Sequence, residues 1–228
     1  MPIALKRLDI DRRRVGLVIV DEVNGFCTVG YGNLAPPSES SQVTRMVDET
    51  DRLARSFAAS ERPILAFLDT HEPGKPEPPY PAHCESGSGE EDLVPALRWL
   101  ESCSHATLVR KDCINGFIGA QTRDGSNRVV AWVNDNRLEY VLTVGICTDI
   151  CVMDFVLTNL SARNHRLMPG LTDIGVYESA CATYDLPKSV AVNIGLPETA
   201  AHPQEVTHHM GLYFMASRGA ELVNAVIL

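Results

Sequence analysis

The sequence predicts an α/β fold in which helices cover both faces of a mostly parallel sheet. Short continuous apolar runs, typical of strands that are buried on both faces, alternate along the chain with segments of helical periodicity. Parallel neighbours need crossover connections, and a helix between two strands supplies one. Because no linker or internal repeat interrupts the alternation, we expect residues 1–228 to form a single domain, with residues 1–13 as a loosely ordered N-terminal segment.

In the first half of the chain, apolar runs that end at polar residues predict three strands. They are expected at residues 16–20, 64–68 and 106–110. An apolar stripe at helical spacing predicts a helix over residues 43–58. The segment 70–87 contains five prolines and is expected to be a long, stiff loop. Ser88 and Glu91 have the spacing of a capping box and predict a second helix that continues to Leu100.

The second half of the chain continues the same alternation. Its expected elements are a short helix at 129–133, a strand at 140–146, a helix around 152–160, a weaker strand at 174–177, a helix from Pro203 to about Arg218 and a last strand near 222–228. Thr148 is placed to cap the N-terminus of the helix after the fourth strand. Cys151 would then lie in the first turn of that helix.

The composition excludes several classes of protein and partner. With 45% hydrophobic and 21% charged residues, the chain is able to bury a core and is not intrinsically disordered. Its 20 Lys and Arg against 29 Asp and Glu give a net charge of -9, without the basic face that nucleic acids and anionic membranes require. The longest apolar runs are far shorter than the about 20 residues of a membrane-spanning helix. The seven cysteines show no disulfide framework and no signal peptide is recognisable, so we expect a cytoplasmic protein.

Residues with catalytic chemistry collect at the carboxyl ends of the predicted strands, where open α/β sheets bind ligands. Asp21 follows the first strand, Lys111 follows the third, and Cys151 opens the helix after the fourth. A helix N-terminus lowers the pKa of a thiol, a carboxylate takes its proton and passes it to a leaving amine, and an ammonium holds that carboxylate. Each residue alone has an ordinary interpretation as a core, turn or surface residue, but their joint occurrence favours amide hydrolysis by a cysteine.

A second group of residues has the spacing of metal ligands. Asp69 and His71 are two residues apart, so in an extended segment their side chains project to the same side. His83 would return to them through the proline-rich loop, and Glu77 offers a further oxygen. One carboxylate and two imidazoles form a plausible open site for Zn²⁺, Mn²⁺ or Fe²⁺. The alternative is that the histidines are ordinary surface loop residues, and the residues alone leave both interpretations open.

Several longer motifs, taken in order, identify a family. They are GLVIVDEVNGFC, LDTHEP, YPAHC, VRKDCINGFIGA, GICTDICV, LSARNH and HPQEVTHHMGLY. The set covers nearly the whole chain after the first dozen residues and resembles the isochorismatase-like cysteine hydrolases, most closely their plant-type nicotinamidases. The resemblance implies a three-layer sandwich with a six-stranded, mainly parallel sheet. It also implies the site residues, which are a catalytic triad of Asp21, Lys111 and Cys151 and the metal ligands Asp69, His71, His83 and Glu77.

The resemblance further implies how a substrate would be held. A cis peptide bond between Ile146 and Cys147 would turn the Cys147 N–H, together with that of Cys151, toward the carbonyl oxygen as an oxyanion hole. Phe26 and Tyr80 would lie beside the substrate ring. The implied activity is the hydrolysis of nicotinamide to nicotinate and ammonia, in NAD salvage. The implied cofactor is a divalent metal ion, for which zinc is expected first and manganese or iron are the alternatives. By analogy with the family, the chain is also expected to form homo-oligomers.

Two other functions fit parts of the pattern. A metal-free amidohydrolase of the N-carbamoylsarcosine or ureidoacrylate type would keep the triad but would not need Asp69, His71 and His83 together. A non-catalytic module would bind nicotinamide or zinc without turnover. A true isochorismatase is disfavoured, because that enzyme lacks a nucleophilic cysteine at the position of Cys151.

Overall fold

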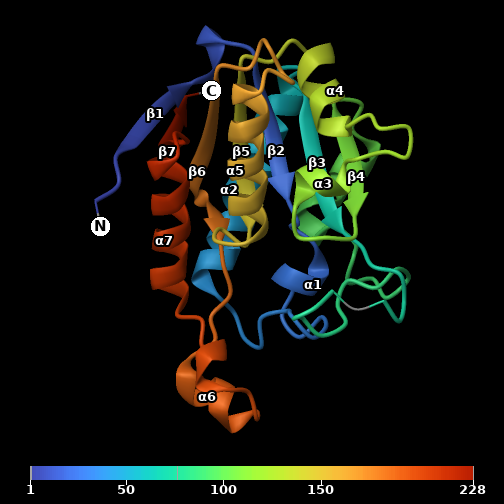
Figure 1. Cartoon of the computed structure of the whole chain (residues 1–228), viewed down its shortest axis with the longest axis vertical. Helices are drawn as coiled ribbons and strands as arrows, with labels where there is room; N and C mark the ends of the chain where they lie inside the picture. Colours follow the sequence, from blue (N-terminus) through green and yellow to red (C-terminus); the bar gives the residue numbers. More distant parts are fainter. Residues whose placement is uncertain (1, 76, 228) are drawn as a thin grey trace.

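A seven-stranded sheet runs through the middle of the molecule, and every pairing in it is parallel (Figure 1). The computed structural model describes residues 2–75 and 77–227. In chain order the strands are β1 (Leu5–Asp9), β2 (Val15–Val20), β3 (Ile64–Asp69), β4 (Ala106–Lys111), β5 (Tyr140–Ile146), β6 (Asp173–Ala182) and β7 (Glu221–Ile227). Their order across the sheet is β1-β7-β6-β5-β2-β3-β4. The predicted α/β class is confirmed, but the sheet has one strand more than the expected six.

The additional strand is β1, which lies in the segment that we expected to be loosely ordered. It pairs with β7 at the edge of the sheet. Its sequence, LKRLD, has neither a continuous apolar run nor an alternating one, and most of its side chains are exposed. Backbone pairing holds the strand in place, and Leu8 and Ile10 anchor the segment by burial in the core. Side-chain patterning therefore carried no signal for it.

Helices cover both faces of the sheet, as predicted. They are α1 (Asn24–Cys27), α2 (Ser41–Ala59), α3 (Gly116–Gly119), α4 (Arg128–Asp135), α5 (Cys151–Asn164), α6 (Lys188–Asn193) and α7 (Gln204–Ser217), with 3-10 helices η1 (Ile10–Arg12), η2 (Pro95–Ser102) and η3 (Glu198–Ala200). Figure 1 shows α5 and α7 in front of the sheet and α2 behind it. Among the described residues, no helix combines the length and the apolar content that a membrane crossing requires.

The two faces of the sheet form two separate cores. Val18 and Val20 of β2 point toward the face where Phe155 of α5 packs. The intervening residues Leu17 and Ile19 belong to the other core, beneath α2 and η2. Strands β2, β3 and β5 are buried along their whole length, which explains why their sequences are continuous apolar runs rather than alternating ones.

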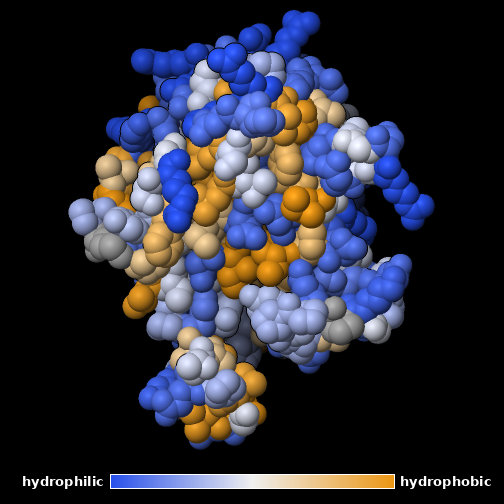
Figure 2. Space-filling view, in the orientation of Figure 1, coloured by the Kyte–Doolittle hydropathy of each residue, from blue (hydrophilic) through white to orange (hydrophobic). Residues whose placement is uncertain are grey.

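Two segments differ from the sequence prediction. Ser88 and Glu91 do interact, at 3.3 Å between their side chains, but they close a loop, and the helix after them starts only at Pro95 and is a 3-10 helix. The second difference is an arm of residues 186–202, which contains α6 and η3 and projects beyond the carboxyl ends of the strands (Figure 1). Apolar side chains lie on its surface (Figure 2), among them those of Val192 and Ile194.

Candidate active site

Four of the predicted site residues lie at one edge of the sheet, at the carboxyl ends of neighbouring strands. Asp21 directly follows β2, while Asp69 and Lys111 are the last residues of β3 and β4. The register of these two strands sets Asp69 opposite Lys111. Cys151 is the first residue of α5, after the turn 147–150 that follows β5. Parallel topology thus gathers residues that are far apart in the sequence.

The Lys111 ammonium joins two carboxylates. Its Nζ lies 2.8 Å from Oδ2 of Asp21 and 2.8 Å from Oδ1 of Asp69, and it donates to the Cys113 carbonyl oxygen at 2.9 Å. The contact with Asp69 is a hydrogen bond, whereas the contact with Asp21 is an ion pair without hydrogen-bond alignment. Burial lowers the pKa of Lys111, but the facing Asp21 and its neighbours raise it well above its usual value. The ammonium therefore stays charged although it is buried.

The Cys151 thiol is buried beside Asp21 and Lys111. Burial raises the pKa of Cys151 well above its usual value, although the Lys111 ammonium acts in the opposite direction. Burial also raises the pKa of Asp21 to about 6, against the lowering effect of Lys111. At neutral pH the carboxyl group is mostly ionised while the thiol keeps its proton. The net shift is opposite to the lowering expected at a helix N-terminus, because burial and the neighbouring carboxylates outweigh the Lys111 ammonium.

The predicted metal ligands Asp69, His71 and His83 form a buried cluster. Oδ2 of Asp69 lies 3.0 Å from Nε2 of His71 and 3.2 Å from Nε2 of His83, and the three possible ligand atoms all lie within 4.8 Å of one another. Nδ1 of His83 donates to the Pro81 carbonyl oxygen at 2.7 Å. This hydrogen bond leaves Nε2 of His83 for a metal, as outer-shell carbonyl groups do in metal sites. The donor set of two imidazole nitrogens and one carboxylate oxygen fits a divalent ion such as zinc.

Glu77 lies at the rim of this cluster. Its Oε2 is 3.8 Å from Nε2 of His71 and 3.8 Å from Nε2 of His83. Its other oxygen, Oε1, accepts a hydrogen bond from the backbone N–H of Ile114 at 2.8 Å. The carboxylate is therefore tied to the loop after β4 on one side and faces both imidazoles on the other.

The remaining predicted residues lie close to the same centre. The ring centroid of Phe26 is 5.6 Å from that of His83, and the ring centroid of Tyr80 is 6.1 Å from it. The peptide bond between Ile146 and Cys147 is cis, as the family resemblance implied. Aromatic rings, a cation, carboxylates and a thiol thus surround one small region at the edge of the sheet.

Other residues of this region were not found from the sequence. Thr148 does not cap α5; Ile150 occupies the N-cap position without a side-chain hydrogen bond, and the Thr148 hydroxyl lies 2.7 Å from Nδ1 of His208. Asp149, next in the turn, pairs with His202 of the arm at 2.8 Å. His202 belongs to the HPQEV motif that forms part of the family resemblance, but nothing in the spacing of that motif connects it to the turn.

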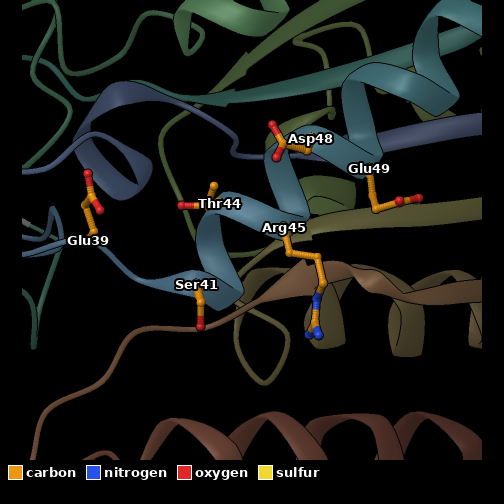
Figure 3. Close-up of a pocket in the computed structure, with 6 residues that line it drawn as sticks. All are labelled: Glu39, Ser41, Thr44, Arg45, Asp48 and Glu49. Carbon is orange, nitrogen blue, oxygen red and sulfur yellow. The ribbon is translucent and has the colours of Figure 1, made fainter.

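A separate hollow lies on the surface along α2 (Figure 3). It encloses about 580 Å³ and is lined by Glu39, Ser41, Thr44, Arg45, Asp48 and Glu49. The lining holds four charged carboxylates or guanidinium groups but neither a thiol nor an imidazole, and none of the residues predicted for the site belongs to it. The residues predicted for the site therefore lie at the strand ends and not in this hollow.

The sequence matches known proteins along most of its length. Residues 15–192 match the isochorismatase domain family. Nicotinamidase 1 of Arabidopsis thaliana is 54% identical over 212 residues, which cover 93% of this chain and 86% of the relative.

Solved structures show the same fold at low sequence identity. A pyrazinamidase/nicotinamidase from Streptococcus mutans has a TM-score of 0.67 at 18% identity, covering 91% of this chain and 99% of its own. An N-carbamoylsarcosine amidase from Thermoplasma acidophilum has a TM-score of 0.65 at 21% identity, covering 92% and 96%. A pyrazinamidase of Pyrococcus horikoshii, solved in complex with zinc, has a TM-score of 0.63 at 18% identity, covering 92% and 99%.

Proposed function

The chain belongs to the isochorismatase family, and from this premise we propose that it is an amidohydrolase that converts nicotinamide to nicotinate and ammonia through a thioester on Cys151. The observation that carries the proposal is the 54% identity to Nicotinamidase 1 over 93% of this chain. The buried group of Asp21, Lys111 and Cys151 supports it, because a thiol, a base and a fixed cation are what amide hydrolysis by cysteine requires.

In the first step, Asp21 takes the proton of the Cys151 thiol while sulfur attacks the carboxamide carbon. The thiol is a weak acid in its buried setting, so proton transfer and C–S bond formation proceed together. Asp21 then gives the proton to the departing nitrogen, the C–N bond breaks, and ammonia leaves. Water attacks the thioester, its proton passes through Asp21 to the sulfur, and nicotinate is released with the thiol restored.

Lys111 keeps Asp21 in place and favours its ionised form at the start of each proton transfer, because its ammonium lies 2.8 Å from that carboxylate. We assign the oxyanion hole to the backbone N–H groups of Cys147 and Cys151, which would donate to the oxygen as negative charge develops on it. A donor that is fixed before the reaction stabilises this charge without the reorganisation that water would need.

Substrate orientation is assigned to the cluster around His83. A divalent ion, zinc in the first place, would be held by Asp69, His71 and His83 and would bind the pyridine nitrogen of the substrate as a Lewis acid. The rings of Phe26 and Tyr80 would contact the faces and edges of the pyridine ring. The zinc complex of the P. horikoshii pyrazinamidase supports the choice of metal.

The wider biological setting is part of the same proposal. A nicotinamidase returns nicotinate to NAD synthesis, so we place the enzyme in NAD salvage in the cytoplasm, acting on a small molecule as one single-domain chain or as a homo-oligomer. The second candidate is an amidohydrolase of the N-carbamoylsarcosine type, because the T. acidophilum amidase shares the fold at a TM-score of 0.65.

Ammonia release tests the proposal directly. The purified protein is assayed with nicotinamide, N-carbamoylsarcosine and ureidoacrylate, beside Cys151→Ala, and bound metal is measured in the same preparation. We expect ammonia from nicotinamide, none from Cys151→Ala, and about one metal ion per chain. Release from N-carbamoylsarcosine alone, by metal-free protein, would instead establish the second candidate. No release from any of the three amides would contradict both.

A further inference from the structure

The turn that carries the nucleophile, residues 147–150, is held from outside by a charged pair. Oδ2 of Asp149 lies 2.8 Å from Nε2 of His202, which sits at the end of the arm. The other oxygen, Oδ1, accepts a hydrogen bond from the Thr183 hydroxyl at 2.7 Å. The two side chains of the pair are largely shielded from solvent, with 16% of Asp149 and 12% of His202 exposed. Both carboxylate oxygens therefore have a partner, and neither partner belongs to the proposed catalytic group.

The hydrogen-bond partners of His202 determine its charge. Its Nδ1 lies 2.9 Å from the Tyr184 carbonyl oxygen, and its Nε2 faces the Asp149 carboxylate. Because both partners are acceptors, both ring nitrogens carry a hydrogen and the ring is an imidazolium. Burial lowers the pKa of His202, but the Asp149 carboxylate raises it, and the balance lies above the usual value. The contact is thus an ion pair rather than a neutral hydrogen bond.

Tyr184 completes this arrangement and links it to the proposed site. Its ring stacks on the His202 ring, with centroids 3.8 Å apart and planes at 12°. A cation against an aromatic face is attractive and holds the imidazolium in one orientation. Burial raises the pKa of Tyr184 to about 12, with smaller contributions from Cys147 and Tyr80. Tyr184 therefore contacts His202 of the arm and is within electrostatic range of Cys147 and Tyr80.

Helix α7 supports the same turn from a second direction. A Cβ added to Gly211 would lie 2.8 Å from the Cα of Asp149, so the helix backbone approaches the turn as closely as glycine permits. The Thr148 hydroxyl lies 2.7 Å from Nδ1 of His208, and the Thr148 backbone N–H donates to the Ala182 carbonyl oxygen at 2.8 Å. Two successive residues of the turn are thus fixed by side chains from elements that follow it in the sequence.

We propose that the Asp149–His202 pair, braced by Tyr184, is a positioning device for catalysis that fixes the turn 147–150 and with it the direction of the Cys151 sulfur. This inference rests on the proposed function and adds residues to it that do not touch the substrate. The turn lies between the end of β5 and the nucleophile, so a small rotation of it moves both the thiol and the backbone N–H groups that would face the oxyanion. A misplacement of about 1 Å at such a site costs about 100-fold in rate.

The His202 side chain is suited to a test because the arm does not depend on it for attachment. The backbone N–H of His202 donates to the Leu186 carbonyl oxygen at 2.8 Å, and the Leu186 N–H donates back at 2.9 Å. These hydrogen bonds remain when the imidazole is removed. Glu198 offers a matched control on the same arm, since it pairs with Lys188 at 2.6 Å on the exposed surface and does not contact the turn.

The experiment compares wild type with His202→Ala, His202→Gln and the control Glu198→Gln in steady-state hydrolysis of nicotinamide. We expect His202→Ala to lower kcat about 10- to 100-fold with little change in KM, the pattern of an interaction that acts on the transition state. His202→Gln should recover most of kcat, because its amide N–H donates to Asp149 from nearly the position of Nε2. Glu198→Gln should match the wild type.

A second readout does not depend on the substrate. The rate at which iodoacetamide alkylates Cys151, followed by mass spectrometry, should fall in His202→Ala and recover in His202→Gln, because a displaced thiol loses its base. Folding of each variant is checked by thermal unfolding. If wild type releases no ammonia from nicotinamide, the proposed function fails, while the alkylation rates still decide the positioning role. The positioning role is overturned if folded His202→Ala matches wild type in both readouts, or if Glu198→Gln is impaired as much as His202→Ala.

Discussion

Two carboxylate–cation pairs lie near Cys151, at the same N···O distance but with different burial. On the side of β2 to β4, Lys111 lies 2.8 Å from Asp21, and neither side chain is exposed. On the side of β5 and the arm, His202 lies 2.8 Å from Asp149, with both side chains partly exposed. Distance alone would rank the pairs as equal. The difference teaches that burial determines how much free energy of unfolding is lost when a pair is broken, because a fully desolvated charge has no water to replace a lost partner.

The pairs also differ in how the fold assembles them. The Lys111 side depends on regular strand register, which sets Asp69 opposite Lys111 in two adjacent parallel strands. The Asp149 side depends on irregular segments, since a turn after β5 meets the end of an arm inserted between β6 and α7. Backbone hydrogen bonds between regular strands position the first pair, whereas hydrogen bonds between side chains position the second.

The largest effect is expected from Lys111→Met, which removes the buried cation. Two buried carboxylates would lose their common partner, and breaking a buried pair in this way costs about 3–5 kcal/mol. Urea unfolding should show this loss in the free energy of unfolding, together with ammonia release at least about 1,000-fold below wild type. Methionine is the appropriate replacement because it keeps most of the volume of lysine. An unchanged free energy of unfolding would show that burial does not set the strength of this pair.

The second largest effect is expected on zinc binding, where loss of His83 from the proposed ligand cluster should cost more affinity than loss of the Glu77 carboxylate at its rim. We expect His83→Ala to bind zinc at least about 100-fold more weakly than wild type, because it removes one of three converging donors. Glu77→Gln should weaken binding less than about 10-fold, since the carboxylate lies 3.8 Å from both imidazole nitrogens. Competition with a chromophoric chelator measures both affinities. Equal losses in the two variants would make Glu77 a full ligand.

A pH-dependent effect should distinguish the two pairs. In the folded protein, Asp149 raises the pKa of His202 above its unfolded value of about 6.5, against the effect of burial. The contribution of the Asp149–His202 pair to the free energy of unfolding is therefore present in full below pH 6.5. It is lost as the pH rises through the higher pKa that His202 has in the folded protein. Groups facing the ring are Asp149, the Tyr184 ring and carbonyl, and the Thr207 hydroxyl.

Differential scanning calorimetry of wild type and His202→Gln tests this pH dependence. We expect wild type to melt about 2–4 °C higher at pH 6 and the difference to shrink clearly at pH 8. The loss in Lys111→Met should show the opposite trend and grow from pH 6 to pH 8, because Asp21, whose pKa is about 6, becomes fully ionised over this range and then lacks its cation. A difference between wild type and His202→Gln that grows with pH would contradict the assignment of His202 as an imidazolium.

The smallest effect is expected from Glu198→Gln on the arm. Its partner Lys188 lies only 2.6 Å away, yet more than 60% of each side chain is exposed. Exposed pairs contribute little because water replaces the lost partner. Urea unfolding should place the variant within about 0.5 kcal/mol of wild type. A larger loss would mean that the arm is more rigidly built than its exposure indicates.

Much of the fold and of the candidate site could be predicted because both follow from strand burial. The run Gly16–Val20 identifies a strand buried on both faces, and the polar residue after it, Asp21, necessarily lies at the carboxyl edge. The same reasoning brings Lys111 and Cys151 to that edge, where the structure places them together with Asp21. Their catalytic roles stay predictions until the variants are assayed.

The features that escaped prediction have physical reasons. Strand β1 is held by backbone pairing at the sheet edge, and its side chains, apart from Leu8, are largely exposed. The contact between Asp149 and His202 spans more than fifty residues and depends on how the arm returns, which no local periodicity encodes. The direction of the Cys151 pKa shift was missed because burial of that thiol is a tertiary property, whereas its place at a helix start is a local one.

The way the arm closes on itself bears on how this protein can diverge. Leu186 and His202 form an antiparallel bridge, so the chain leaves and re-enters the body of the protein through a narrow neck. Because hydrogen bonds between Leu186 and His202 already join the two ends of the arm, lengthening or shortening the arm costs little closure entropy. Residues beyond the neck are thus free to vary in length and sequence, while the neck itself, tied to Asp149, is where we expect selection to act.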